Sequence, residues 1–471
     1  MNKSITSVNL KYIIIIFVLI ILIFKLRYLN TKSLFTNAYS FFNKKTKIFS
    51  NSDPDIQLKI KYKKCGYLKL QNTLTEVFEK YNFESVDEEE DNDWDVYIPC
   101  GYNYAETELK KIKISHPNQK VYAIRGCDKI ASKNELWKII SDFYGREEAS
   151  KLIPESYIIN NPKDIQMFKK KYNKNNLYLL KKNIQRKEGI LITNDYKQIL
   201  NIVDNTTKSI KDYYNNIENN KTLDTYVNKQ IVNTNNTNND TEKDTNKDTD
   251  EEDYNKNQKM NSLINNYKII QTYINDLYII KNRKCNIRLY LLIICNKGDK
   301  QAYLYNFGKC IYTNKDFDKD SDNNQETNNK TNNKVVDLDK EKHLTSYLLD
   351  QDIYKTHPET LDDLKTYMSK EKYDCLWNQI MILFTNVMHA VKGNVCNSKK
   401  LNDIMTFQLF GADIIFTRNL HPYLLELNKG PSMKYMNPND KKMKLQLTED
   451  LFKQVGIIPF QKKEESNFTK I

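Results

Sequence analysis

Three oxygen-bearing side chains near the end of the chain have a spacing that could hold a metal ion. The stretches ADIIF and YLLELN read as two apolar strands joined by TRNLHP. We expect an antiparallel hairpin in which Phe416 lies opposite Tyr423. Asp413 then lies opposite Glu426, and Asn428 shares the face of Glu426 because side chains alternate along a strand. Facing carboxylates destabilise a sheet unless a cation neutralises them, and oxygen-only ligands suit Mg²⁺ that bridges nucleotide phosphates. An exposed sheet face with spaced acids is the alternative.

Cationic side chains on two other predicted strands could hold such phosphates. The chain has no GxxxxGKS/T stretch and only 11 glycines, which argues against a Walker loop and a GxGxxG dinucleotide fold. Lys284 and Arg288 lie four residues apart and share one face of a strand whose other face is apolar. Two inward cations there are unfavourable unless anions lie beside them. Lys181 and Lys182 end another strand, where surface lysine in a lysine-rich chain is an equally good explanation.

The elements that must position these residues follow from apolar periodicity and from turn-forming residues. The spans 285–295 and 301–312, joined by NKGDK, read as a hairpin. Two tracts rich in Asn, Thr, Asp and Lys, about 205–262 and 314–340, lack the apolar residues for a core, so we predict disordered insertions there. The predicted helices are 70–81, 375–393 and about 440–455, and the other predicted strands are 93–99, 120–125, 178–182, 189–193, 267–276, 406–416 and 423–428.

The formal net charge of +13 indicates which partners to expect, and the eight cysteines indicate which redox compartment to expect. Abundant Lys, Asn, Ile and Tyr indicate a coding bias, which weakens the charge as evidence of function. A basic surface favours an acidic protein tail, an anionic lipid or a nucleic acid, but no nucleic-acid-binding motif appears, so we expect no nucleic-acid partner. The cysteines form no CxxC pair and no zinc spacing, which favours mostly buried or neutral thiols in a reducing compartment.

An apolar run near the N-terminus predicts a membrane anchor. The run Tyr12–Phe24 is short for a bilayer span of about 20 residues, but Lys11 and Lys25 can extend it by snorkelling. A cleaved signal peptide is the alternative, although no small-x-small cleavage site follows. We therefore predict a single-pass anchor within 1–29, in the membrane through 12–29, followed by a basic tether over 30–60. Basic residues are denser after the run, which predicts that the bulk of the chain faces the cytosol.

Five segments in order resemble the tubulin–tyrosine ligase-like family of tubulin tyrosine ligases and polyglutamylases. They are IRGCDKIASKNELWKII with IPESYII, LLKKNIQRKEGILI, QTYINDLYIIKNRKCNIRLYLLI, HLTS, and FQLFGADIIF with HPYLLELNKGPS. The match covers most of 120–456. It implies an ATP-grasp-like fold of the α/β (α+β) class, with antiparallel sheets and flanking helices. The implied divisions are an N-terminal α/β domain (61–155), a central subdomain (156–284) and a C-terminal subdomain (285–460).

The resemblance also implies a role for each site residue. Mg²⁺ would be held by Asp413, Glu426 and Asn428. The ATP phosphates would contact Lys133 and Lys181, and the adenine slot would be lined by Gln271, Tyr273 and Ile274. Lys284, Arg288 and Thr345 would face the phosphates and the incoming substrates.

The chemistry implied by the resemblance is ATP-dependent amide or isopeptide ligation through an acyl phosphate. Its partners would be a free amino acid and an acidic protein acceptor, with the tubulin C-terminal tail as one candidate. This chain departs from the family pattern at Asn286, at Ser346, at Lys309 and in a flap with one glycine, Gly189. Two alternatives therefore stay open: a catalytically degenerate membrane-tethered binding protein, and an ATP-grasp ligase with a non-tubulin acceptor.

Overall fold

The computed structural model describes most of the chain from Ile60 onward. No helix within the described part is both long and apolar enough to cross a bilayer. The predicted anchor at 12–29 and nearly all of the predicted tether lie outside it. The described residues are 60–64, 70, 72–86, 92–99, 105–183, 189–212, 215, 266–317, 338–346, 349–461 and 464–471.

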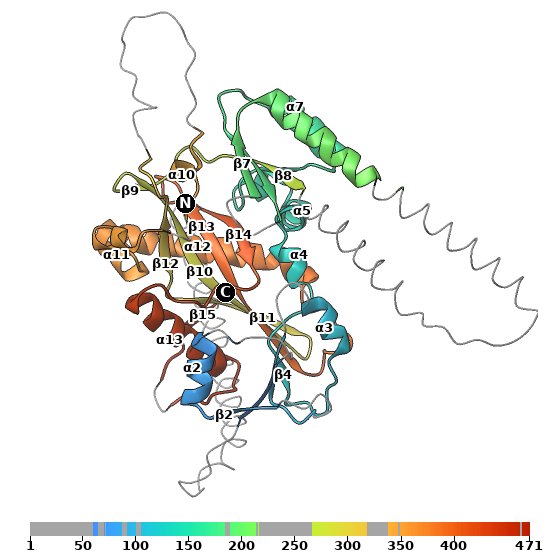
Figure 1. Cartoon of the computed structure of the whole chain (residues 1–471), viewed down its shortest axis with the longest axis vertical. Helices are drawn as coiled ribbons and strands as arrows, with labels where there is room; N and C mark the ends of the chain where they lie inside the picture. The colour runs from blue at the N-terminus through green and yellow to red at the C-terminus, as the bar shows by residue number, and fades with distance from the viewer. Residues whose placement is uncertain are drawn as a thin grey trace, which may run out of the picture. The chain divides into compact units, whose positions relative to one another are not determined.

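A large mixed sheet organises the unit Ile60–Ile471 (Figure 1). Its centre is the antiparallel pair β10 (Arg283–Asn296) and β13 (Met405–Phe416), which runs from Ile287 opposite Ile414 to Cys295 opposite Thr406. Short parallel strands extend it on one side, and β15, at the end of the chain, pairs with β11 on the other. The remaining strands are β1 (Ile60–Lys64), β2 (Phe83–Ser85), β3 (Val96–Ile98), β4 (Lys120–Val121), β9 (Ile279–Ile280), β11 (Asp299–Tyr305), β12 (Lys309–Tyr312), β14 (Pro422–Asn428) and β15 (Phe468–Lys470).

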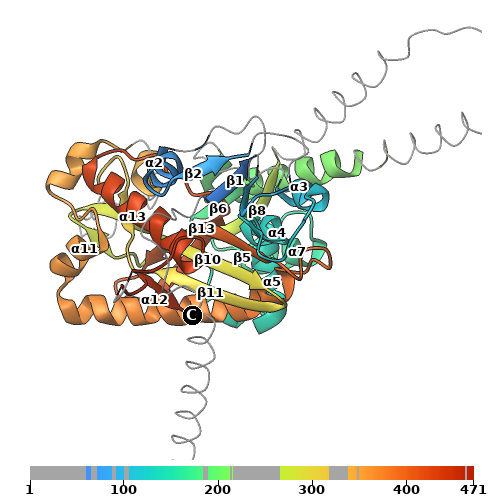
Figure 2. The ribbon, with the colours of Figure 1, turned by 90° about the horizontal axis from the view of Figure 1, so that it is seen from below.

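Alternation along β10 divides the core into two layers. Ile287, Leu289, Leu291 and Ile293 pack against α5 (Lys133–Tyr144), α11 (Leu361–Met368) and α12 (Lys370–Val391). The opposite face, from Tyr290 onward, packs against α2 (Asn72–Lys80) and α13 (Pro438–Gln454). Figure 2 shows α12 and α13 on opposite sides of β10. Before Tyr290 that second face is polar, and it is this polar part that carries Lys284, Asn286 and Arg288.

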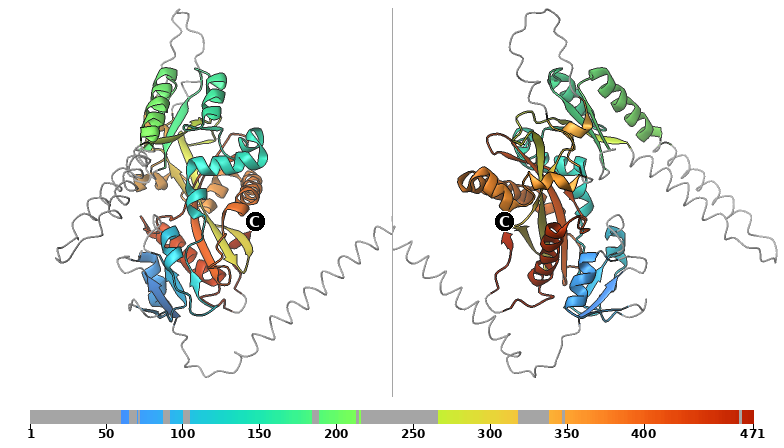
Figure 3. Two further views of the ribbon diagram at one scale, coloured as in Figure 1. Left: turned by 90° about the vertical axis from the view of Figure 1, so that its right-hand side faces the viewer. Right: turned by 60° about the vertical axis from the view of Figure 1, so that its left-hand side comes forward.

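A second, four-stranded antiparallel sheet has the order β5-β8-β6-β7. Its strands are β5 (Ser156–Ile158), β6 (Tyr178–Lys182), β7 (Ile190–Thr193) and β8 (Tyr267–Thr272). One face packs on α7 (Pro162–Lys171) and on a helix over 196–212. Figure 3 shows this sheet and α7 at the opposite end of the unit from α2.

Short helices complete the described fold. They are α3 (Ala105–Lys111), α4 (Cys127–Ala131), α6 (Arg146–Ala149), α10 (Lys340–His343), η4 (Gln351–Lys355) and η5 (Lys392–Asn394). The antiparallel sheets and flanking helices are consistent with the predicted ATP-grasp-like fold. β4, in the predicted N-terminal domain, pairs in parallel with β13, in the predicted C-terminal subdomain.

The predicted strand 301–312 is in fact two strands. β11 forms the expected hairpin with β10, but the chain then turns at Gly308 and β12 pairs with the beginning of β10, so that Lys309 lies opposite Arg288. A Cβ at Gly308 would lie 2.5 Å from the carbonyl oxygen of Arg288, so only glycine allows this approach without a shift of the backbone.

Helices overlap the edges of both predicted insertions. The helix over 196–212 runs into the first one, and α10 begins inside the second, where Lys315 Nζ lies 2.9 Å from Asp339 Oδ2. The helix buries Ile199 and Val203 just before the tract and Thr206 within it, so packing of its first turns carries the helix into a segment whose composition indicated disorder. The rest of both tracts lies outside the described residues.

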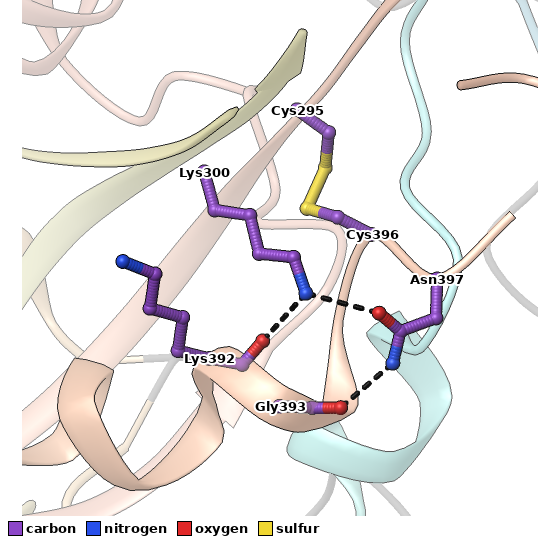
Figure 4. Close-up of a disulfide and its surroundings, with 6 residues drawn as sticks. All are labelled: Cys295, Lys300, Lys392, Gly393, Cys396 and Asn397. Atoms are coloured by element: carbon purple, nitrogen blue, oxygen red, sulfur yellow. Dashed lines mark hydrogen bonds between the residues drawn. A yellow bond between two sulfur atoms is a disulfide. The ribbon is translucent and has the colours of Figure 1, made fainter. Parts of the chain in front are cut away.

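The cysteines depart in part from the expectation of free thiols. Cys295, at the end of β10, forms a disulfide with Cys396, 101 residues later (Figure 4). Their Cα atoms lie 5.6 Å apart, a usual separation for a disulfide. Cys127, Cys285 and Cys310 are free and buried, as expected, whereas Cys375 is free and exposed.

Candidate functional site

Ten of the eleven predicted site residues line one cavity of about 210 Å³. The small sheet contributes side chains from β6 and β8, the large sheet contributes side chains from β10, β13 and β14, and α5 contributes its first residue. The ten are Lys133, Lys181, Gln271, Tyr273, Ile274, Lys284, Arg288, Thr345, Asp413 and Glu426. Asn428 is not among the lining residues, but its amide Nδ2 donates to Glu426 Oε1 at 3.1 Å.

The carboxylate hairpin has the expected pairing at its polar end and a different register at its turn. Asp413 lies opposite Glu426, and Gly411 lies opposite Asn428. Phe416, however, pairs with Pro422 rather than with Tyr423. A β-bulge between Asp413 and Ile414 absorbs the difference of one residue.

Each of the two carboxylates contacts a cation of the chain itself. Arg288 donates from Nε and Nη2 to the two oxygens of Asp413 at 2.5 and 3.0 Å. Lys133 Nζ lies 3.0 Å from Glu426 Oε2. Burial opposes ionisation of Glu426, but Lys133, together with Lys181 and Asn428, outweighs it and lowers the pKa of Glu426 to about 2. Burial raises the pKa of Asp413, and Arg288 offsets part of that effect.

The donor set fits a magnesium ion. Two carboxylates from adjacent strands and the amide of Asn428 offer oxygen ligands only, which is what Mg²⁺ prefers in proteins. The side chains of Asp413 and Glu426 are 14% and 23% exposed, so an ion can reach them from the cavity. When bound, the ion would replace Arg288 and Lys133 as the neutralising charge.

Two lysines on the cavity wall are buried beside neutral acceptors. Lys181 Nζ donates to Gln271 Oε1 at 2.6 Å, and Gln271 is itself held by Ser156 Oγ at 3.0 Å. Lys284 Nζ donates to the carbonyl of His343 at 2.7 Å and lies 4.8 Å from the centre of the Tyr273 ring. Burial lowers the pKa of Lys181 to about 8 and that of Lys284 to about 7. An anion in the cavity would stabilise the charged form of both.

An apolar slot lies between the two sheets beside these lysines. Leu179, Ile192, Tyr273, Leu277, Leu344 and Ile415 form one buried cluster there. Ile274, the residue after Tyr273, is half-buried and lines the cavity. Apolar walls next to cations fit a purine base joined to phosphates.

Thr345 is placed by Asn286, one of the departures from the family pattern. Asn286 Nδ2 donates to Thr345 Oγ1 at 3.0 Å. The other amide atom, Asn286 Oδ1, is buried and has no hydrogen-bond partner in the described part of the chain. Both residues line the cavity, so a ligand donor could satisfy this oxygen.

A second cavity, of about 80 Å³, adjoins the first and shares Arg288 and Ile311 with it. Lys309 Nζ lies 3.1 Å from Glu359 Oε1, and Lys444 Nζ lies 3.1 Å from Asp440 Oδ2. Asp440 Oδ1 is buried and has no partner among the described residues.

Sequence reasoning did not find this group. Asp440 and Lys444, four residues apart in a predicted helix, were a usable signal, because α13 buries both. Lys309 was noted only as a departure from the family pattern, and Glu359 gave no signal, because β12 and the segment before α11 meet only in the fold.

Comparisons with known proteins show which sequences this chain resembles. A sequence model of the tubulin-tyrosine ligase family matches residues 111–465. The probable tubulin polyglutamylase TTLL9 of Bos taurus is 25% identical over 41% of this chain and 39% of its own length. Tubulin polyglutamylase ttll-5 of Caenorhabditis elegans is 26% identical over 39% of this chain and 26% of its own length. Tubulin monoglutamylase TTLL4 of Mus musculus is 24% identical over 40% of this chain and 16% of its own length. The chain thus spans about two fifths or less of each relative.

Proposed function

The chain belongs to the tubulin-tyrosine ligase family, and from this premise we propose that it is an ATP- and Mg²⁺-dependent ligase that joins glutamate to a carboxylate of a protein acceptor. The convergence of buried cations, paired carboxylates and an apolar slot on one cavity carries the proposal. The relatives' names, tubulin polyglutamylase and tubulin monoglutamylase, support tubulin as acceptor and glutamate as the added amino acid.

The reaction would proceed in two steps that need no protein nucleophile. A carboxylate oxygen of the acceptor attacks the γ-phosphorus of ATP, ADP leaves, and an acyl phosphate forms. The amine of glutamate then attacks the acyl carbon, inorganic phosphate leaves, and the amine loses a proton. Lys181, Lys284 and Arg288 would orient the phosphates and stabilise the charge that develops on them. Magnesium held by Asp413, Glu426 and Asn428 would supply further neutralisation of phosphate charge.

The second cavity is a suitable site for the incoming amino acid. Lys309 and Lys444 can face a carboxylate, and the unpartnered Oδ1 of Asp440 can accept from an ammonium group. A zwitterion bound there would lie next to Arg288, which lines both cavities. The amine would therefore approach the same point as the phosphates, as the second step requires.

A binding protein without turnover is the second candidate, and Asn286 favours it. This residue places a neutral amide on the cavity wall where the family pattern has an aspartate. Such a protein would bind Mg-ATP and gain thermal stability, yet transfer no glutamate whatever acceptor is offered. A ligase with a non-tubulin acceptor would transfer glutamate to other acidic proteins.

Membrane attachment remains a proposal based on residues 12–29. Its support is the apolar run and its flanking lysines. Fusing residues 1–60 to a fluorescent protein should direct that protein to membranes. A diffuse fusion protein would contradict it.

Incorporation of labelled glutamate into tubulin in the presence of Mg-ATP tests the proposed reaction. Glu426→Gln and Lys181→Ala should each lower incorporation by about a hundredfold or more, the size of effect seen when a charge-stabilising group is lost. Lys182→Ala is the matched control, because this neighbouring lysine does not line the cavity and its Nζ lies 5.2 Å from the centre of the Tyr267 ring. Wild-type incorporation by both Glu426→Gln and Lys181→Ala would refute the site assignment.

A further inference from the structure

A basic groove lies outside the cavities described above. It has a volume of about 460 Å³ and is lined by Leu109, Lys110, Arg125, Asn397, Ser398, Lys399 and Lys400. Four of these seven residues are cationic, and none of the lining residues is acidic. Leu109 is 5% exposed and gives the groove an apolar floor. Lys110, Arg125, Lys399 and Lys400 are all exposed.

The two walls of the groove are fixed to each other. The amide of Cys396 donates to the carbonyl of Arg125 at 2.9 Å, and Lys400 Nζ donates to the carbonyl of Lys110 at 2.7 Å. The Cys295–Cys396 disulfide attaches the same loop to β10. The four cations are thus held close together before any ligand arrives, and their mutual repulsion is relieved when an anion binds.

Further hydrogen bonds order the loop that carries the lysines (Figure 4). Lys300 Nζ donates to the carbonyl of Lys392 at 2.9 Å and to Asn397 Oδ1 at 3.0 Å. Asn397 Nδ2 donates to the carbonyl of Gly393 at 2.7 Å. These bonds and the disulfide give the loop a defined conformation, so little ordering is required when it binds a partner.

We propose that this groove binds an acidic segment of the polypeptide acceptor, away from the carboxylate that is modified. The proposal rests on the proposed function, since it concerns the acceptor of that reaction. Lysine and arginine along the walls of a concave surface match a run of carboxylates in an extended chain. A membrane surface is flat and fits cations on a flat face, whereas this surface is hollowed and its floor at Leu109 is recessed.

The separation of the groove from the catalytic cavity sets a length requirement. Cys295 pairs with Thr406 at the groove end of β10, and Arg288 pairs with Asp413 at the cavity end. Seven residues of strand, at about 3.3 Å each, separate the two ends by roughly 23 Å. An acceptor that occupies both places therefore needs at least about seven extended residues between them. A shorter acceptor can occupy the groove or the catalytic cavity, but not both.

Fluorescent oligoglutamate peptides of about 4 and about 14 residues test the groove on the full chain. The variant Arg125→Ala/Lys399→Ala/Lys400→Ala removes three charges from it. The matched control, Lys163→Ala/Lys169→Ala/Lys170→Ala, removes three exposed charges from α7. We expect the groove variant to weaken binding of the long peptide about tenfold in anisotropy titrations, and the control to change it less than about twofold.

In the ligase assay the groove variant should raise the KM of the long acceptor about tenfold and leave kcat unchanged, while the short acceptor is unaffected. Equal weakening by both triple variants, or none by the groove variant, would overturn the proposal. The proposal would also be overturned if the groove variant lost binding to phosphatidylserine vesicles but still bound the long peptide like wild type. If peptide binding depends on the groove but no glutamate is ever transferred, the proposed function fails and the groove assignment stands.

Discussion

Four charged side chains lie in one row across neighbouring strands: Lys309 on β12, Arg288 on β10, Asp413 on β13 and Glu426 on β14. Two cations thus stand beside two anions, and Arg288 contacts Asp413 directly. A metal at the carboxylates would compete with this pair. We expect Mg²⁺ binding to release Arg288 toward the phosphates, which couples metal binding to the arrangement of the cation.

Lys284 gives opposite pH dependences to stability and to ATP binding. Burial lowers its pKa to about 7, whereas in the unfolded chain it is near 10.4. Between these two pKa values the folded protein binds fewer protons than the unfolded chain, so the contribution of Lys284 makes the free energy of unfolding rise with pH. ATP binding favours the protonated amine, so the affinity for ATP should fall about tenfold between about pH 7 and pH 9.

Urea denaturation and calorimetric ATP titration at these two pH values measure the two trends. Lys284→Met should flatten both relative to wild type, and Lys182→Met serves as the control that should change neither. If wild type and Lys284→Met showed the same pH slopes, Lys284 would not titrate in this range.

The hairpin register shows what could be predicted at the residue scale. Alternation along a strand correctly placed Asp413 opposite Glu426, although the expected partner of Phe416 was wrong by one residue. The bulge that corrects the difference has no distinctive residue in the sequence, so it could not be foreseen. The contact between Asn428 and Glu426 followed from period-two spacing alone. For the second cavity only the pair Asp440 and Lys444 on one helix could have been noticed, because Lys309 and Glu359 come from two other segments.

At the scale of elements, Gly308 decides where β12 lies. Because a Cβ there would meet the carbonyl of Arg288 at 2.5 Å, Gly308→Ala should force β12 away from β10. We expect a loss of about 1–3 kcal/mol in the free energy of unfolding, typical of overpacking, and weaker ATP binding because Arg288 moves with the strand.

Gly393→Ala is the matched control, since nothing lies within 4 Å of a Cβ built there. It should change the free energy of unfolding by less than about 0.5 kcal/mol, as surface substitutions usually do. Guanidinium denaturation compares the two variants. Equal stability of Gly308→Ala and wild type would mean that β12 can shift without loss of packing.

Long helices and strands with strong apolar periodicity could be predicted, whereas the turn that separates two short strands could not. The expected helix over 375–393 and strand over 285–295 correspond to α12 (Lys370–Val391) and β10 (Arg283–Asn296). The span 301–312 reads as one apolar run, because both β11 and β12 carry buried apolar side chains and the turn between them contains a single glycine. The close approach of Gly308 to the carbonyl of Arg288, which sequence periodicity does not report, is what places β12 beside the beginning of β10.

At the scale of the whole unit, the cavity joins two sheets. Lys181 and Gln271 come from the small sheet, and Arg288, Asp413 and Glu426 come from the large one. A ligand that contacts both should hold them together. We expect Mg-ATP at a hundredfold excess over its Kd to raise the free energy of unfolding by about 2.7 kcal/mol.

Thermal unfolding with and without Mg-ATP measures this gain, and Asp413→Ala should abolish most of it. The surface variant Asp142→Ala is the control, because its partner Lys138 lies on the exposed face of α5. Full stabilisation of Asp413→Ala by Mg-ATP would show that the hairpin is not part of the nucleotide site.

The end of the chain is built into the large sheet. β15 pairs with β11, the Phe468 ring lies 4.8 Å from that of Tyr305, and the amide of Ile471 donates to the carbonyl of Ala302 at 3.0 Å. A purification tag or a reporter fused directly after Ile471 would therefore begin at a hydrogen-bonded sheet edge. A flexible spacer is needed at that junction, and variants shortened before Phe468 would leave Tyr303 and its neighbours on β11 open to pairing between molecules.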